Sequence, residues 1–146
     1  MKKKEIWYPL GRPAIQQTDN DINEVELLKD FVVIDDEGTE WIAKEGLISD
    51  GESSPEMFEW LAGDPFAAVS LPGVIIHDYY CKTKEKPQQD THKILYKLWC
   101  HEIKHNKEFG WVLALPWNNK AWHYSRAWVK WRLVVRYQRI KNPDWQ

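Results

Sequence analysis

A histidine–aspartate pair directly follows an apolar run in "VIIHDYY", and a further aspartate opens the next apolar pattern in "QQDTHKILYKLW". These three residues are His77, Asp78 and Asp90. A carboxylate that accepts a hydrogen bond from one imidazole nitrogen fixes the tautomer and leaves the other nitrogen free to accept a proton. We therefore predict a hydrolytic centre in which His77 is the general base and Asp90 orients it. Asp78, pointing elsewhere, would hold a divalent metal ion or activate a polar group.

Two helices must bring these residues together. Prolines open helices predicted at about 72–81 and 87–106, and the segment "KTKEK" joins them. If the two helices are antiparallel, residues equidistant from Lys84 face each other, which places Asp90 opposite the pair. Because neighbouring helix positions diverge by about 100°, Asp90 can approach only one member closely, and we favour His77. The alternative is a buried His–Asp hydrogen bond that only ties the two helices together.

The segment before these helices is typical of strands. Apolar residues alternate roughly over Glu24–Ile34 and again over Thr39–Ile48, and "DDEG" between them is a turn signal. We predict a β-hairpin or a small antiparallel sheet. Further helices are predicted at about 55–63, with Ser54 as its N-cap, and at about 118–140. Strands followed by about four helices indicate an α+β fold.

The length and charge of the chain limit what it can be. Its 146 residues suit one domain, with an irregular arm at 1–20, strands at 22–50 and a helical part at 55–140. The net charge of −2 gives no global reason to expect binding to nucleic acid. No apolar stretch suits a membrane span or a secretory signal, and two cysteines make no disulfide framework. We expect a protein made in a reducing cytoplasm.

Three motifs in order carry a family resemblance. The segments "GLISDGESSP", "VIIHDYY" and "QQDTHKILYKLW" resemble those of the phage and prophage family catalogued as domain of unknown function 1353. The resemblance covers roughly residues 30–138. It departs from the family pattern where Leu47 and Ser49 replace Phe and Thr, and where Cys81 replaces an aromatic residue. It implies a phage or prophage origin, with synthesis in the host cytoplasm, and a polar cluster of Asp50, Ser53, His77, Asp78 and Asp90.

The turn that contains Asp50 and Ser53 has two interpretations. Its side chains could bond their own backbone ahead of a helix, which is the ordinary role of such turns. In the functional interpretation, Asp50 and Ser53 join the pocket of His77, and Asp50 is a second metal ligand beside Asp78. The His–Asp pair with a remote aspartate also looks like the arrangement in secreted phospholipases A2. The chain lacks their disulfides and an evident calcium loop, so we infer no lipase from this analogy.

The pentapeptide "HEIKH", from His101 to His105, matches the H-E-x-x-H zinc pattern. A catalytic zinc site needs a third protein ligand, and the downstream candidates are Glu108, His123 and Asp144. The metzincin continuation would have Gly at position 108 and His at position 111, and the chain has neither. We interpret the match as a chance pattern at a solvated helix end. An alternative to free, buried cysteines is a zinc ion held from different helices by Cys81, His92, Cys100 and His101.

The last helix is the second informative segment. From Lys120 to Lys141 it carries seven Lys or Arg residues and no acid. It could be a core helix with a solvated basic face, a docking helix or a membrane-surface helix. We predict Trp128, Trp131 and Arg132 as binding residues.

Two hypotheses from different classes follow from these motifs. The first is a phage-encoded accessory protein with a hydrolase-like His77 centre and a divalent cation. The second is a non-catalytic protein of the virion, associated with its tail, or a protein that interacts with the host. In the second hypothesis, the last helix binds other phage or host proteins or a membrane surface. No specific nucleic acid is predicted.

Overall fold

The computed structural model describes residues 4–19, 24–49, 69–107 and 119–146. Within these residues, five short strands lie in two small antiparallel sheets. One sheet has the order β1-β2-β5, and the other is a hairpin of β3 and β4. The strands are β1 (Ile15–Gln17), β2 (Val25–Leu27), β3 (Phe31–Ile34), β4 (Glu40–Ala43) and β5 (Ile48–Ser49).

The β3–β4 hairpin confirms the predicted turn at "DDEG". Phe31 pairs with Ala43, and Val33 pairs with Trp41. These four side chains alternate along their strands and are buried, so one face of the hairpin joins the core. Gly38 has a φ of +86°, a conformation that favours glycine at this position of the turn.

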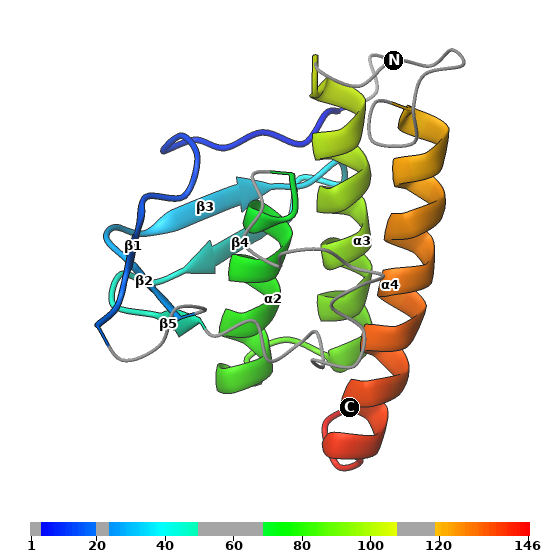
Figure 1. The fold of residues 1–146 in the computed structure, drawn as a ribbon. Helices are drawn as coiled ribbons and strands as arrows, with labels where there is room; N and C mark the ends of the chain where they lie inside the picture. Colours follow the sequence, from blue (N-terminus) through cyan, green and yellow to red (C-terminus); the bar gives the residue numbers. More distant parts are fainter. Residues whose placement is uncertain (1–3, 20–23, 50–68, 108–118) are drawn as a thin grey trace.

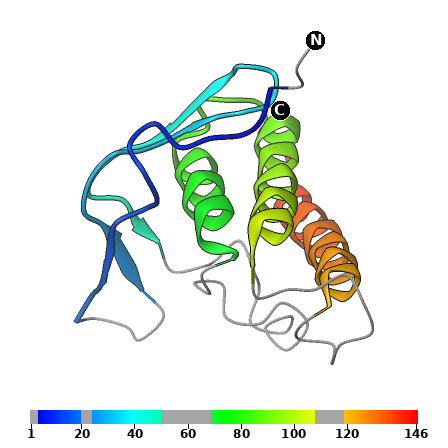
Figure 2. The ribbon, with the colours of Figure 1, turned by 90° about the horizontal axis from the view of Figure 1, so that it is seen from above.

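Three helices follow the strands in the part of the chain that the structure describes. They are α2 (Leu71–Thr83), α3 (Gln88–His105) and α4 (Lys120–Lys141). Figure 1 shows them side by side in chain order, each antiparallel to its neighbour, and Figure 2 shows the β3–β4 hairpin beside α2 and α3. None of the described helices has the length and apolar character needed to span a bilayer.

The α+β class is confirmed, with corrections to its parts. We predicted about four helices; three lie among the described residues, and the helix expected at 55–63 falls outside them. Within the arm predicted as irregular, β1 pairs with β2. The single strand predicted over 24–34 is instead β2 and β3, which belong to different sheets. A bend at Lys29 divides them. The sequence does not reveal this break, because the apolar residues of β2 and β3 follow each other closely.

Two apolar clusters hold these elements together. The first lies between the sheets and the α2–α3 pair and includes Phe31, Trp41, Ile76 and Leu98. The second joins the three helices and includes buried side chains from each: Val74, Leu95, Trp99, Ala127 and Val134.

Side chains of α4 also bond to the main chain of α3. Trp131 Nε1 donates to the carbonyl of His92 at 2.6 Å, near the start of α3. Lys120 Nζ donates to the carbonyl of Lys104 at 2.7 Å, near its end. Polar contacts therefore fix α4 near both ends of α3, in addition to the apolar packing.

Gly73 lies at a close approach of α2 to α3. A Cβ atom added there would lie 2.9 Å from Trp99 Nε1, 3.0 Å from Trp99 Cδ1 and 3.1 Å from Leu95 Cδ1. The Trp99 indole is buried and donates to the Ser70 carbonyl at 3.2 Å, so it has little room to move. Only glycine fits at this crossing without displacing the indole.

We therefore expect Gly73→Ala to lower the free energy of unfolding. Overpacking costs about 1–3 kcal/mol, and the better helix propensity of alanine returns at most about 1 kcal/mol. The net loss should be about 1 kcal/mol in urea denaturation monitored by circular dichroism. A second measurement in a Trp99→Phe background should give a smaller loss, because the smaller ring leaves space for the methyl group. An equal loss in both backgrounds would contradict the steric explanation.

Candidate functional site

His77 lies in the middle of α2 and is completely buried. Its Nε2 is 2.9 Å from Nδ1 of His92, which comes from the first turns of α3. Its Nδ1 is 3.5 Å from Sγ of Cys81, one helical turn further along α2. Both imidazole nitrogens of His77 therefore have partners inside the protein.

The two histidines form a neutral pair. Burial, followed by repulsion from His92, holds the pKa of His77 well below its usual range. Burial, followed by the positive charge of Arg139, lowers the pKa of His92 to about 4. Neither imidazole is protonated at neutral pH, so one ring donates its N–H to the lone pair of the other. His92 Nε2 is buried without a hydrogen-bond partner among the described residues.

The predicted contact between His77 and Asp90 is wrong. No hydrogen bond joins the two residues, and the Asp90 side chain is exposed on α3. His92, two positions further along the helix, occupies the place expected for Asp90. The reason is the apolar face of α3: His92 shares a side with Leu95 and Trp99, which are buried.

Asp78 is buried and points to a different partner. The Ser49 hydroxyl of β5 donates to its Oδ2, which ties α2 to the first sheet. Asp78 therefore makes a structural contact with Ser49 and is shielded from water. The other residues predicted for this cluster, Asp50 and Ser53, lie outside the described residues.

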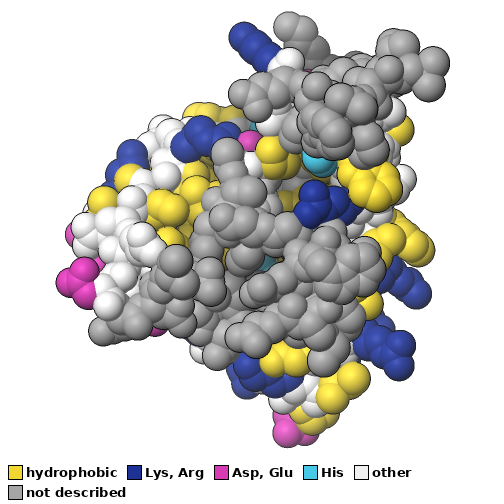
Figure 3. All heavy atoms as spheres, viewed as in Figure 1, with side chains coloured by type: hydrophobic (Ala, Val, Ile, Leu, Met, Phe, Trp, Pro, Cys, Tyr) yellow, Lys and Arg dark blue, Asp and Glu magenta, His cyan; other side chains and the backbone are white. Residues whose placement is uncertain are grey.

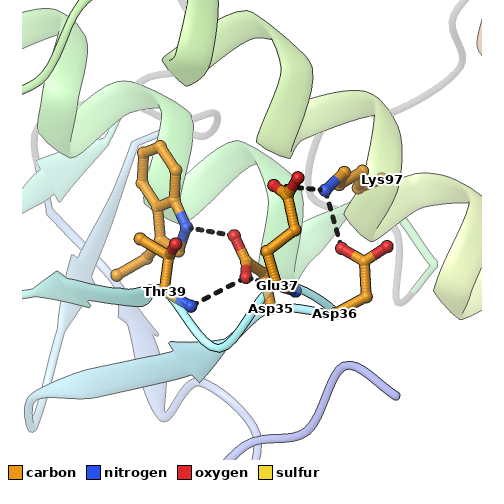
Figure 4. A network of polar contacts seen from close by, with 6 residues as sticks. Asp35, Asp36, Glu37, Thr39 and Lys97 are labelled. Carbon is orange, nitrogen blue, oxygen red and sulfur yellow. Dashed lines mark hydrogen bonds and ion pairs between the residues drawn. The ribbon is translucent and has the colours of Figure 1, made fainter. Parts of the chain in front are cut away.

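Asp90 instead lines a pocket of about 200 Å³ between the β3–β4 turn and α3. This pocket has both acids and lysines in its wall, including Asp35 and Lys97. The turn and α3 are joined by Lys97 Nζ, which lies 2.6 Å from an Asp36 oxygen and 3.1 Å from a Glu37 oxygen. Figure 4 shows these ion pairs beside the Asp35 carboxylate.

Asp35, Asp36 and Glu37 form the only group of three metal-ligating side chains found among the described residues. Asp35 accepts hydrogen bonds from the turn, and Lys97 neutralises the other two acids. These contacts account for the cluster as a stabilised turn. Among the described residues, the alternative zinc ligands Cys81, His92, Cys100 and His101 do not come together in such a group.

The H-E-x-x-H residues lie at the end of α3, where the N-terminal arm crosses it. Glu102 is buried and accepts a hydrogen bond from the Tyr8 hydroxyl at 2.6 Å. Arg12 donates to both Glu102 oxygens, at 3.0 and 2.8 Å. Glu102 thus anchors the arm to the helix. A carboxylate held by an arginine and a phenol is not free to act as the general base of a zinc protease.

The three binding residues predicted on α4 do not share a face. Trp131 is half-buried against α3, where it contacts Tyr96 with ring centroids 5.3 Å apart. Trp128 is 51% exposed, and the Arg132 guanidinium lies over its ring at 5.6 Å. We therefore correct the prediction: Trp131 is a packing residue, and Trp128 and Arg132 belong to the surface.

The outward side of α4 carries a surface that we call the Trp/Arg face. At about 100° per residue, its members fall within about a third of the helix circumference. It combines large apolar side chains with arginines and consists of Trp122, Trp128, Val129, Arg132, Arg136, Arg139 and Ile140, all exposed. Figure 3 shows hydrophobic and basic side chains together along the edge of the molecule that α4 forms.

Sequence reasoning missed His92 and Ser49 as members of the buried cluster. The position of His92 could have been found, because its spacing to Leu95 and Trp99 is that of one helix face. Ser49 gives no such signal, since its contact with Asp78 joins residues 29 positions apart.

Comparisons with known proteins identify the family but no activity. The model of the family described as "Protein of unknown function (DUF1353)" matches residues 25–113. The uncharacterized protein y4jT of Sinorhizobium fredii is 36% identical over 107 residues, which are 72% of this chain and 31% of that protein. The uncharacterized protein y4iH of the same species is 31% identical over 72 residues, which are 49% of this chain and 30% of that protein.

The matched region spans less than a third of either relative. No solved structure matches the chain. The family model covers more than half of the residues, and it includes β2 to β5, α2 and α3, which hold the histidine pair. The chain therefore belongs to the DUF1353 family of proteins of unknown function.

Proposed function

We propose that this chain is a phage-encoded binding protein, made in the host cytoplasm, that docks on an acidic surface of another phage or host protein. The observation that carries the proposal is the Trp/Arg face of α4. It presents two half-exposed tryptophans and three arginines on one side of a helix that contains no acid. Tryptophan and arginine are enriched among the residues that dominate binding energy at protein interfaces.

The arrangement of this face favours a protein over a membrane. An interfacial helix separates an apolar face, which enters the lipid, from a charged face. Here Arg132 and Arg136 lie among Trp122, Trp128 and Val129, so no side of the face is free of charge. A guanidinium beside an indole is instead suited to a carboxylate on a protein surface, which it can bind through two parallel hydrogen bonds.

The buried cluster gives less support to a hydrolase. A general base must reach the proton that it abstracts, and His77 is enclosed with both nitrogens occupied. Asp90, the predicted orienting residue, lies at the surface without contact to it. Hydrolysis at His77 remains a prediction, and the burial of the cluster favours its role in fixing α2 against α3 and β5.

Photocrosslinking from the helix surface tests the proposed docking. A photoreactive phenylalanine analogue at position 128, in the full chain expressed in its producing host, should form a discrete adduct with a partner protein. The same analogue at Lys93, exposed on α3, is the matched control and should not form it. Arg132→Glu combined with Arg136→Glu should reduce the adduct by about tenfold or more, because like charges then face the acidic partner.

The adduct should also weaken when the salt concentration rises, because exposed charge pairs are screened. An adduct that forms equally from positions 128 and 93, or that survives the double charge reversal, would contradict the proposal. Crosslinking to lipid in place of protein would show that the membrane alternative is correct.

A further inference from the structure

A second pocket, of about 440 Å³, lies at the carboxyl end of α3. The N-terminal arm supplies Tyr8 and Arg12 to its wall, and α3 supplies His101, Glu102 and His105. It lies on a different helix from the Trp/Arg face and shares no residue with it. The chemistry of this pocket is therefore independent of the docking proposed above.

The two histidines are paired across one helical turn. Residues four apart on a helix lie on one side, and here the ring centroids are only 4.5 Å apart, with the ring planes inclined by 49°. His101 is half-buried and His105 is exposed, so the pair lies at the opening of the pocket. Two imidazoles at this separation can direct one nitrogen each toward a shared ion.

The surroundings of His101 favour its neutral imidazole, which is the form that binds metals. Burial and the neighbouring His105 lower the pKa of His101, with Glu102 and Glu5 acting in the opposite direction. The last turn of α3 also presents main-chain carbonyls, and the negative end of the helix dipole stabilises a cation there. Two lysines oppose this effect: Lys104, which is paired with Glu5 at 3.6 Å, and Lys120, whose ammonium binds the Lys104 carbonyl at 2.7 Å.

The glutamate between the two histidines has a separate task. Tyr8 and Arg12 occupy its oxygens, so Glu102 stabilises the wall of the pocket and does not ligate an ion in this arrangement. The H-E-x-x-H pattern therefore provides two ligands without a free base. The remaining coordination positions of an ion would be taken by water or by a further ligand in the pocket.

We infer that His101 and His105 form a binding site for one divalent transition metal ion of the Zn²⁺, Ni²⁺ or Cu²⁺ class. Imidazole ligands suit these ions, whereas Mg²⁺ and Ca²⁺ require oxygen ligands. The inference adds a site that the proposed docking function does not need. It also differs from a zinc-protease centre, because Glu102 is held by Arg12.

Calorimetric titration of the tag-free full chain with Zn²⁺ tests this site. We expect saturable binding of one ion, and no binding of Mg²⁺ under the same conditions. His105→Ala and His101→Ala should each weaken Zn²⁺ binding by about tenfold or more. His123→Ala, which removes a histidine on α4 outside this pocket, is the matched control and should bind like the wild type.

A structural readout separates lost ligation from misfolding. In NMR spectra, Zn²⁺ should shift the imidazole signals of His101 and His105 together and leave the buried His77 signal unchanged. Because His105 is exposed, His105→Ala should keep the thermal unfolding midpoint of the metal-free wild type. Wild-type binding that does not saturate, or unchanged affinity in both alanine variants, would overturn the inference. Neither result would affect crosslinking from position 128.

Discussion

Replacing Asp35 with alanine is expected to lower the free energy of unfolding by about 3 kcal/mol. Its buried carboxylate accepts hydrogen bonds from the backbone amides of Thr39 (Figure 4) and Glu37, both at 2.9 Å, and from Trp41 Nε1 at 3.0 Å. Hydrogen bonds to a charged acceptor contribute about 1.5–3 kcal/mol each, and an unpaired buried donor costs about 1–3 kcal/mol. The indole of Trp41 is buried and would be left without its partner.

The neighbouring acid provides the matched control. Asp36→Ala removes a carboxylate from the same turn, but that carboxylate is partly exposed and only forms an ion pair with Lys97. Such pairs contribute about 0–1 kcal/mol. Urea denaturation of both variants should therefore separate them by about 2 kcal/mol or more. Similar losses for Asp35→Ala and Asp36→Ala would show that the carboxylate does not organise the hairpin.

The neutral histidine pair is expected to make the protein sensitive to mild acid. The pKa of His92 is lowered from 6.5 to about 4 in the folded state, and that of His77 is also lowered. At a pH between the ordinary histidine pKa of 6.5 and the lowered pKa in the folded state, the unfolded chain binds more protons than the folded chain. The free energy of unfolding therefore falls as the pH falls. For His92 the loss begins near pH 6.5 and is complete below about pH 4. His92 alone should account for about 3–4 kcal/mol in full, at about 1.4 kcal/mol per pKa unit, and for about 2–3 kcal/mol of this by pH 4.5.

Denaturation in urea at pH 7.5 and at pH 4.5 measures this loss, and a His92→Gln variant identifies its source. Glutamine can keep a hydrogen bond to His77 but does not titrate. The variant should therefore lose less stability than the wild type between the two pH values. Although burial raises the pKa of Asp35, hydrogen bonds from Trp41, Thr39 and Glu37 lower it overall, so this carboxylate titrates below the window. Equal losses in the wild type and the variant would rule out His92 as the cause.

The helices could be predicted closely because their ends depend on local residues. Pro72 and Pro87 mark where α2 and α3 begin, and the observed bounds differ from the predicted ones by two residues at most. Asn119 caps α4 by accepting hydrogen bonds from the amides of Ala121 and Trp122. The turn at Asp35 is also local, and it was predicted for the same reason.

The rotation of α3 about its axis could not be predicted from the loop. Counting outward from Lys84 assumes a symmetrical hairpin, but Lys84 ends α2 in a left-handed conformation with a φ of 56°. The apolar side chains of α3 then decide which residues turn inward, and they select His92 over Asp90. Contacts between distant segments, such as Ser49 with Asp78, depend on the completed fold and leave no local pattern.

The attachment of α4 to α3 has an evolutionary consequence. Trp131 and Lys120 bond to carbonyl oxygens, which every amino acid at positions 92 and 104 would supply. Mutational drift at these two positions therefore leaves both anchors intact. The outer helix can therefore keep its placement while the residues beneath it diversify, so its exposed surface can change without a compensating change in α3.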